Sequence, residues 1–335
     1  MKWKDWLRIG RMQTAPADAC LILVPVLMCY SFTDLSTWLM LGIAILLHFL
    51  GFGHNSLMDT ALGYDLKDPS KRHHPLVAGR ISLHTAHLVI HSLLMTSAIA
   101  IGAFTYYYAK EPALSLLFLL IYYTAGVAYN SGLDKETPFS FIPISICFTS
   151  LAGWAWTMVQ PLNQLGIIYM AYIFLTILFQ IAYEGNLKEL PVAGKVERVN
   201  FLTLLGARLQ KRTYRWEDYS WIVDYFHPGY SAVFAWIVKI LSILLIGLLI
   251  TENWSILWFS ALSTGIIIQL YTLTAPRPYR RDCELFNMSL MEILSIYLPI
   301  PIFVPEVDAV ILMVLGVLWF FGFNKLLWEA SYPRV

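Results

Sequence analysis

The chain of 335 residues is 58% hydrophobic and only 13% charged, whereas soluble domains carry about a quarter charged residues. A formal net charge of +1 gives no basis for nucleic-acid binding, and the class that fits is a polytopic membrane protein. The polar, basic N-terminus has no small-residue cleavage site after the first apolar run, which predicts no cleavable signal peptide.

Apolar runs long enough to cross a bilayer follow one another along the chain. The expected helices cover residues 17–34, 36–54, 84–107, 112–130, 139–160, 163–184, 229–251, 254–274, 285–303 and 308–328. Pro299, Pro301 and Pro305 interrupt the last two runs, so the count is about nine or ten. We therefore predict an all-α, polytopic transmembrane helix bundle.

The basic residues indicate an orientation. With the N-terminus in the cytoplasm, every Lys and Arg except Lys110 and Lys239 falls in an inner segment, as the positive-inside rule requires. The functional loops are then expected on the cytoplasmic side of a bacterial or archaeal plasma membrane or of an organelle membrane. Lys239 lies inside an apolar helix, where it either snorkels to the interface or pairs with another group.

Two polar clusters follow the second and the sixth helix, so both end on the inner rim. Each precedes a similar fragment, Pro75–Arg80 in the first and Pro191–Lys195 in the second. We interpret the chain as a single domain, 1–335, of two related four-helix halves followed by extra helices. The halves span about 12–135 with a motif at 54–82 and about 139–282 with a motif at 183–208, and the extra helices span about 285–328.

The first cluster brings oxygen-bearing side chains to the end of an apolar helix. Asn55 and Asp59 are four residues apart, so they share a helical face, and Gly63 is expected to end the helix. Asp65 then follows in the loop. Amide and carboxylate oxygens suit Mg2+, which takes few carboxylates and shares its coordination with phosphates. The plain alternative is a solvated, salt-bridged loop, which fits Asn55 and Asp59 least because they stand on the apolar helix.

This cluster resembles the first motif of the UbiA superfamily of intramembrane prenyltransferases. That motif has Asn, then Asp four and eight residues later, then Pro-Leu-x-x-Gly-x-Ile-Ser, which matches Asn55, Asp59 and the run from Pro75 to Ser82. Gly63 stands eight residues after Asn55, and the third carboxylate is displaced to Asp65. The resemblance continues after the fourth helix, from Tyr129 to Lys135, at Tyr183-Glu184 on the sixth-helix rim, and at Leu204-Leu205-Gly206.

The second motif departs further from the family pattern. Glu184 stands where the family has its first aspartate, and the next candidates, Asn186 and Glu189, do not match the family spacing. Lys188 stands where an acid is expected, so contact between Lys188 and a diphosphate in place of a metal is a further hypothesis.

The resemblance implies an integral membrane prenyltransferase. Such an enzyme moves an isoprenyl group from a prenyl diphosphate to a small acceptor, in some cases aromatic or a quinone precursor, through a Mg2+-assisted allylic cation. It implies catalytic roles for Asn55, Asp59, Asp65 and Glu184, and metal ligation by Asn55, Asp59, Asp65, Glu184 and Glu189. It further implies diphosphate contacts from Lys67, Arg72, Lys135 and Lys188. The expected partners are the two substrates and the lipid bilayer.

Two other functions stay open at this point. A membrane terpene cyclase of the same superfamily would capture the cation within one substrate and need no acceptor. A transporter or lipid-binding protein would keep the helices without the chemistry, although the polar groups gather at one rim rather than at mid-membrane.

Two further segments carry unusual patterns. His84, His87 and His91 share one helical face, which indicates a polar pocket or interhelical hydrogen bonds more readily than a metal site. Residues 208–226 mix charges with aromatic residues, a pattern that predicts an amphipathic helix at the cytoplasmic interface.

Overall fold

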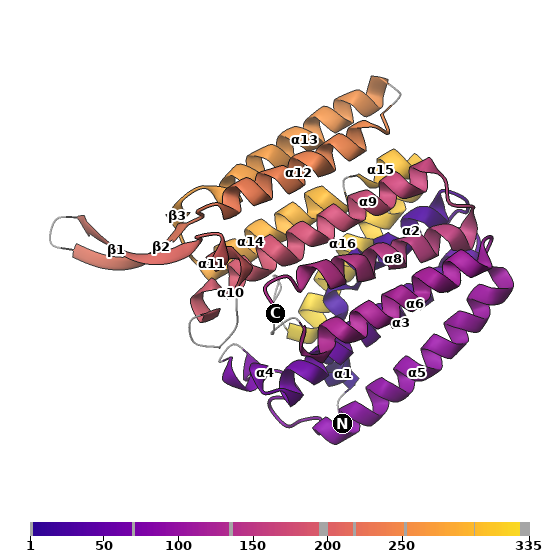
Figure 1. The fold of residues 1–335 in the computed structure, drawn as a ribbon, viewed down its shortest axis with the longest axis horizontal. Coiled ribbons are helices and arrows are strands. Elements are labelled where there is room, and N and C mark those ends of the chain that lie inside the picture. Colours follow the sequence, from indigo (N-terminus) through magenta and orange to yellow (C-terminus); the bar gives the residue numbers. More distant parts are fainter. Residues whose placement is uncertain are drawn as a thin grey trace. The chain divides into compact units, whose positions relative to one another are not determined.

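The computed structural model describes residues 3–68, 71–133, 137–193, 200–216, 219–250, 253–297 and 299–328. These residues are mostly helical, with one three-stranded sheet (Figure 1). They include eight helices that are long and apolar enough to cross a membrane, and two shorter apolar helices, Met12–Leu27 and Ser231–Gly247. The predicted polytopic helix bundle is confirmed.

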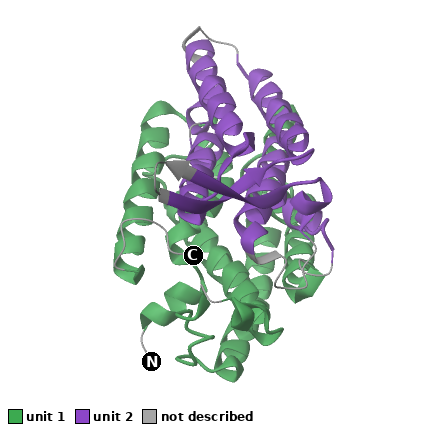
Figure 2. Ribbon diagram, turned by 90° about the vertical axis from the view of Figure 1, so that its left-hand side faces the viewer, with its two compact units in different colours: residues 1–133, 146–170, 303–335 green, residues 134–145, 171–302 purple. Residues whose placement is uncertain are grey.

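The chain divides into two compact units, and each is described by itself (Figure 2). Unit 1 comprises residues 1–133, 146–170 and 303–335, and unit 2 comprises residues 134–145 and 171–302. The interpretation of the chain as two related four-helix halves stays a prediction.

Unit 1 holds the N-terminal helices and the last helix. Its elements are α1 (Trp3–Ile9), the 3-10 turn η1 (Met12–Thr14), α2 (Ala15–Leu27), α3 (Leu35–Ala61), α4 (Tyr64–Lys67), α5 (Leu83–Tyr108), α6 (Pro112–Ala128), the π-helical turn η3 (Tyr129–Leu133), most of α8 (Phe141–Val159), the start of α9 (Gln164–Phe179) and α16 (Glu306–Trp328). Trp319 Nε1 donates to the carbonyl oxygen of Met12 at 2.7 Å. The Tyr169 hydroxyl donates to the carbonyl oxygen of Leu21 at 3.2 Å. Aromatic side chains with one polar atom thus join segments that are distant in the sequence.

The sequence sets both ends of α3. Asp34 precedes the helix and accepts a hydrogen bond from the Ser31 amide at 2.7 Å. The helix ends at Ala61, and Gly63 follows with a φ of 82°, a left-handed conformation that glycine adopts without strain. The prediction that Gly63 ends the helix is confirmed, and Asn55 and Asp59 lie on its last turns.

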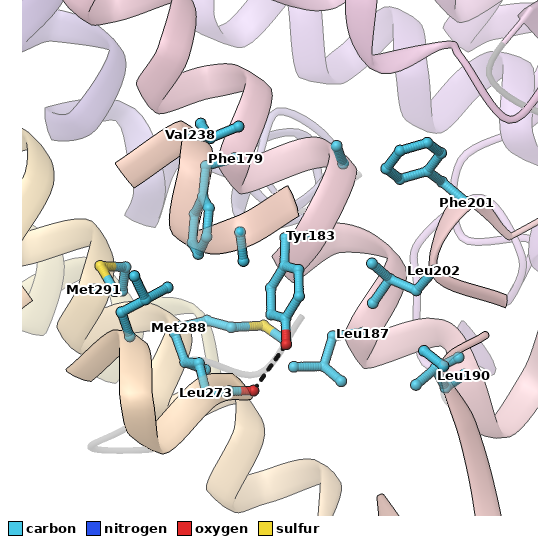
Figure 3. Close-up of a cluster of buried hydrophobic side chains, with 14 of the residues drawn as sticks. Phe179, Tyr183, Leu187, Leu190, Phe201, Leu202, Val238, Leu273, Met288 and Met291 are labelled. Carbon is cyan, nitrogen blue, oxygen red and sulfur yellow. Dashed lines mark hydrogen bonds between the residues drawn. The ribbon is translucent and has the colours of Figure 1, made fainter. Parts of the chain in front are cut away.

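Unit 2 holds the remaining helices and the sheet. Its elements are the start of α8, the rest of α9, the π-helical turn η4 (Gln180–Gly185), α10 (Asn186–Ala193), α11 (Phe201–Leu204), β1 (Arg208–Trp216), β2 (Tyr219–His227), α12 (Ser231–Gly247), α13 (Asn253–Thr274), β3 (Arg277–Pro278), α14 (Arg281–Glu292), the π-helical turn η5 (Ile293–Tyr297) and nearly all of α15 (Ile300–Phe303). Its core surrounds Phe179 and Tyr183, whose rings stack at 5.3 Å (Figure 3). The Tyr183 hydroxyl donates to the Leu273 carbonyl at 2.9 Å, which satisfies the one polar atom of this buried ring.

The predicted amphipathic helix at 208–226 is wrong. The described residues of this segment form an antiparallel hairpin, in which Tyr214 pairs with Trp221 and their rings stack at 6.3 Å. The short strand β3 adds to the base of β2. Aromatic and β-branched residues favour strands because they pack well across neighbouring strands. In this segment the strand preference of these residues outweighs the helix that the spacing of the charges predicts.

Candidate functional site

The first predicted cluster lies entirely in unit 1. Asn55 and Asp59 stand one turn apart on α3, and both are half-buried. Asp65 lies on the one-turn helix α4 and is only 7% exposed. The shared face of Asn55 and Asp59 follows directly from the spacing, and Gly63 allows the chain to turn before Asp65.

A hydrogen-bond network fixes which atom of Asn55 is the oxygen. Asn130, at the start of η3, donates through Nδ2 to the Gly51 carbonyl at 3.2 Å, and a carbonyl can only accept. Its Oδ1 therefore accepts from Asn55 Nδ2, also at 3.2 Å. Oδ1 is therefore the acceptor atom of the Asn55 side chain, and Arg11 Nη2 donates to it at 3.5 Å. An amide oxygen oriented in this way suits a cation.

The loop after α4 carries the predicted cations. Lys67 and Arg72 are exposed, and Arg72 Nε donates to the His73 ring at 3.0 Å. His74 is only 9% exposed, and both of its ring nitrogens lack a hydrogen-bond partner among the described residues. Burial, together with the charges of Lys71, Arg11 and Arg80, lowers the pKa of His74 to about 3. His74 is therefore neutral in a basic neighbourhood.

The second predicted cluster lies in unit 2. Glu184, on η4, is 4% exposed, and its Oε1 has no hydrogen-bond partner among the described residues. Lys188 and Glu189 follow on α10, both half-buried. Glu184 interacts electrostatically with Lys188 and with Lys239 of α12. Lys135, the remaining predicted contact, lies outside the described residues.

Asn186 has a structural role. Its Nδ2 donates to the Ile181 carbonyl at 3.0 Å, and its Oδ1 accepts from the Phe201 amide at 3.1 Å. These bonds tie the turn η4 to the segment that begins at Asn200. The amide of Asn186 is therefore used by backbone groups, in keeping with its position outside the family spacing.

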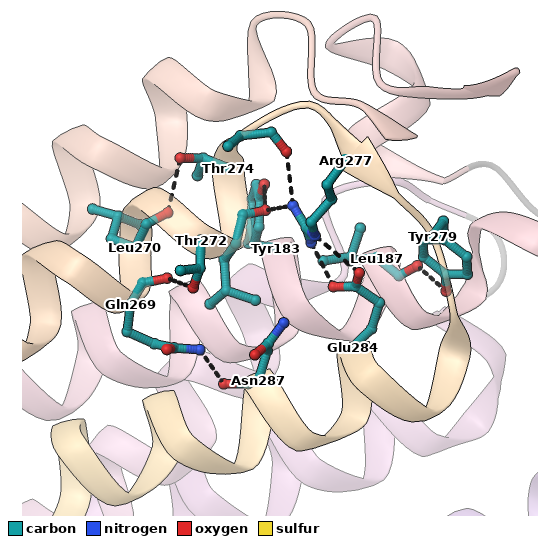
Figure 4. A network of polar contacts seen from close by, with 12 residues as sticks. Tyr183, Leu187, Gln269, Leu270, Thr272, Thr274, Arg277, Tyr279, Glu284 and Asn287 are labelled. Carbon is teal, nitrogen blue, oxygen red and sulfur yellow. Dashed lines mark hydrogen bonds and ion pairs between the residues drawn. The ribbon is translucent and has the colours of Figure 1, made fainter. Parts of the chain in front are cut away.

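A largely buried ion pair lies beside Tyr183 in unit 2 (Figure 4). Arg277 Nε donates to Glu284 Oε1 at 3.0 Å, and Arg277 Nη1 donates to the Leu273 carbonyl at 2.7 Å. Tyr279, next to this pair, donates to the Leu187 carbonyl of α10 at 3.1 Å. Arg277 and Glu284 therefore satisfy each other and hold β3 against α13 and α14.

The donor set of the first cluster fits Mg2+. Asn55, Asp59 and Asp65 offer one amide and two carboxylate groups, and Mg2+ prefers oxygen ligands with few carboxylates. Across the described residues, no three His, Cys, Asp or Glu side chains gather as a metal-binding group. The compatibility of the set with a hard cation therefore rests on the chemistry of its oxygen donors.

The histidine face of α5 makes ring contacts. The His91 ring lies 5.3 Å from that of His54, edge to face, and 4.1 Å from that of His87. Asn130 Nδ2 lies 3.4 Å from His54 Nδ1. Across helices this face makes a ring contact with His54, and the expectation of a polar pocket or of interhelical hydrogen bonds stays a prediction.

Comparison with known proteins assigns the fold to a family. The model of the UbiA prenyltransferase family matches residues 20–296. The chain belongs to the UbiA prenyltransferase family. The resemblance found in the motifs is thereby confirmed, and with eight long apolar helices this UbiA family member is an integral membrane protein. A search of curated protein sequences gives no match.

Solved structures share the fold of this UbiA family member. A digeranylgeranylglyceryl phosphate synthase superposes with a TM-score of 0.63 at 15% identity, over 92% of this chain and 98% of that chain. A UbiA homologue from Archaeoglobus fulgidus bound to GPP and Mg2+ gives 0.59 at 14% identity, over 89% and 99%. An apo UbiA homologue from Aeropyrum pernix K1 gives 0.58 at 15%, over 91% and 98%. At such identities the likeness shows the fold.

Two residues of the first cluster were missed by sequence reasoning. In the sequence, Arg11 is one of the basic residues that indicate the orientation, and Asn130 belongs to the motif from Tyr129 to Lys135 without a predicted role of its own. An isolated asparagine at the end of an apolar run was the available signal for Asn130, because an unpaired amide there would be costly.

Proposed function

We propose that the chain is a prenyltransferase that moves an isoprenyl group from a prenyl diphosphate to a small acceptor, aromatic or quinone-precursor in class. The observation that carries the proposal is the orientation of Asn55, whose Oδ1 is presented by Asn130 one helical turn from Asp59. Membership in the UbiA prenyltransferase family supports it. So does the fold shared with a homologue bound to GPP and Mg2+.

Each predicted residue keeps a role in the proposal. Asn55, Asp59 and Asp65 would hold Mg2+, and Glu184 with Glu189 would form a second acidic group. When bound, Mg2+ supplies positive charge that stabilises a departing diphosphate. The cations proposed to contact the diphosphate are Lys67, Arg72, Lys135 and Lys188.

The protein itself contributes charge and exclusion of water. Exposed Lys67 and Arg72 can follow a phosphate group as it enters, since neither is fixed inside a core. Buried Asp65 and half-buried Asn55 are held more rigidly and fix geometry. Apolar helix faces would shield the allylic cation from water. The proposed loops face the cytoplasm, in agreement with the distribution of Lys and Arg.

Membranes that contain the protein provide the direct test. They are incubated with labelled prenyl diphosphates of several lengths, with and without aromatic acceptors, at graded Mg2+ concentrations. Acceptor-dependent release of diphosphate that requires Mg2+ is the expected result. Release without an acceptor would instead identify a terpene cyclase. No release with any donor would favour a transporter or lipid-binding protein, and release without metal would contradict the Mg2+ assignment.

Asp59→Ala tests the site within the same assay. The variant should lose transfer by at least a hundredfold while its thermal unfolding stays unchanged, because Asp59 is half-buried at the end of α3. Asp34→Ala, which removes a carboxylate at the opposite end of the same helix, is the matched control and should retain activity. Full activity in Asp59→Ala would refute the assignment.

A further inference from the structure

Arg11 has an unusual backbone conformation. Among the described residues it is the one non-glycine residue with a positive φ, at 47°. Side chains with a Cβ atom are disfavoured in this left-handed region, so the surrounding structure must hold the residue there. Residues in strained backbone conformations are found often at functional sites, because the strained backbone places their side chains where the site needs them.

Two side chains hold the Arg11 backbone. Its carbonyl oxygen lies 3.1 Å from Nε2 of His48, and because a carbonyl only accepts, Nε2 is the donor of this hydrogen bond. Nδ1 of the same ring lies 2.6 Å from Oδ2 of Asp18 on α2, a hydrogen bond in which a second proton lies between these two atoms. The His48 side chain is fully buried, so Asp18 fixes the ring and the ring fixes the Arg11 carbonyl.

The Arg11 side chain points to the first cluster. Its guanidinium lies 5.4 Å from the centre of the Phe52 ring, which in turn lies 4.6 Å from the His48 ring. Its Nη2 reaches Asn55 Oδ1 at 3.5 Å. One face of α3 therefore contacts both the backbone and the side chain of Arg11, and directs its charge to the proposed metal ligand.

Arg11 also differs from its neighbours in charge. Arg8 and Arg80 both pair with Asp5, at 3.2 and 3.1 Å. Within the described part of the chain, no carboxylate forms an ion pair with Arg11. A half-buried guanidinium that has no carboxylate partner among the described residues, held in a strained conformation beside Asn55, is prepared for an anion that arrives from outside.

We infer that Arg11 is a substrate-binding residue that takes a phosphate or carboxylate oxygen at the first cluster, and that His48 and Asp18 are the positioning residues that hold it there. The identity of the anion rests on the proposed function. A diphosphate of the donor is favoured because Asn55, the contact of Arg11, is also a proposed ligand of the metal that would bind it.

Binding of inorganic pyrophosphate in the presence of Mg2+ tests the role of Arg11 without requiring that the protein catalyse a reaction. Calorimetric titration of the full chain in detergent should show affinity at least tenfold weaker in Arg11→Gln. Arg11→Gly should bind as weakly, and because glycine accepts the left-handed backbone, this variant separates loss of charge from misfolding. Lys4→Gln removes one charge from the same N-terminal segment and should stay within twofold of the wild type.

Steady-state kinetics identify the source of the anion. A higher KM for the prenyl diphosphate in Arg11→Gln assigns Arg11 to the donor, whereas a higher KM for the acceptor alone assigns it to an anionic acceptor. Unchanged pyrophosphate affinity together with unchanged KM for both substrates would overturn the inference. If the wild type transfers nothing, the proposed function fails, while the pyrophosphate titration still tests Arg11.

Double variants test the positioning role. Asp18→Asn and His48→Phe should each weaken pyrophosphate binding, with kcat reduced less than KM is raised. Neither should weaken binding further in the Arg11→Gln background, because the group they position is then absent. Equal losses in both backgrounds would show that they act on stability alone and would overturn their assignment.

Discussion

Lys239 Nζ donates a hydrogen bond to Ser295 Oγ at 2.8 Å, inside the apolar helices of unit 2. Lys239 is 2% exposed, and its ammonium lies 4.3 Å from the centre of the Phe179 ring. The carboxyl of Glu184 interacts with this ammonium electrostatically. Of the two possibilities left by the sequence, Lys239 therefore pairs and does not snorkel. Burial of an ammonium is costly unless such partners compensate it.

Replacement of Lys239 by methionine should destabilise the protein by about 3 kcal/mol, because Ser295 Oγ and the buried Glu184 carboxyl then lose the ammonium that interacts with them. Unfolding in detergent with increasing denaturant measures this. Glu184→Gln should restore part of the loss in the Lys239→Met background. Ile240→Met, at the exposed neighbouring position on α12, is the control and should change stability by less than about 0.5 kcal/mol. An unchanged midpoint in Lys239→Met would contradict the pairing.

His74 should make stability depend on pH. Burial and the nearby cations lower its pKa from 6.5 to about 3 in the folded chain. The unfolded chain therefore binds one more proton between these values, and stability falls as the pH drops below 6.5. The slope from this residue is at most about 1.4 kcal/mol per pH unit.

Comparison of unfolding at pH 7 and pH 5 isolates this contribution. His74→Leu should lose less stability than the wild type over the interval, by about 2 kcal/mol. His84→Leu, at an exposed position, should behave as the wild type. Equal pH dependence in all three proteins would show that His74 is not held neutral.

The base of the hairpin should be more important for stability than its middle. Phe226 is fully buried, pairs with Arg277 of β3 and lies 4.8 Å from that guanidinium. Phe226→Ala should therefore cost about 3 kcal/mol through the cavity it leaves. Ile222→Ala, four residues away on the same face of β2 and 67% exposed, should cost less than about 0.5 kcal/mol. Protease cleavage within residues 208–227 provides the readout, and equal protection in the two variants would contradict the buried anchor.

Much of the first cluster could be predicted because it depends on local rules. The spacing of Asn55 and Asp59 places them on one face of a helix, and Gly63 ends that helix. Glu184 could likewise be placed at the end of an apolar run. Arg11 could not be placed with them, because nothing in a single basic residue between two helices indicates its left-handed backbone or its contact 44 residues away. The hairpin was missed because residues 208–226 carry both a helical charge pattern and strand-forming aromatics.

The sequence by itself determined the membrane location, through its composition and the length of its apolar runs, and the short spacing of Asn55 and Asp59 placed them on one helical face. Its motifs also resemble those of the family to which the chain belongs. Tertiary structure decided the orientation of the Asn55 amide, the pairing of Lys239 and the position of Arg11. The reason is physical: hydrogen-bond partners of buried polar groups are chosen by packing. Asn130 is 75 residues from Asn55, and Ser295 is 56 residues from Lys239. Only the folded helices bring these pairs within reach.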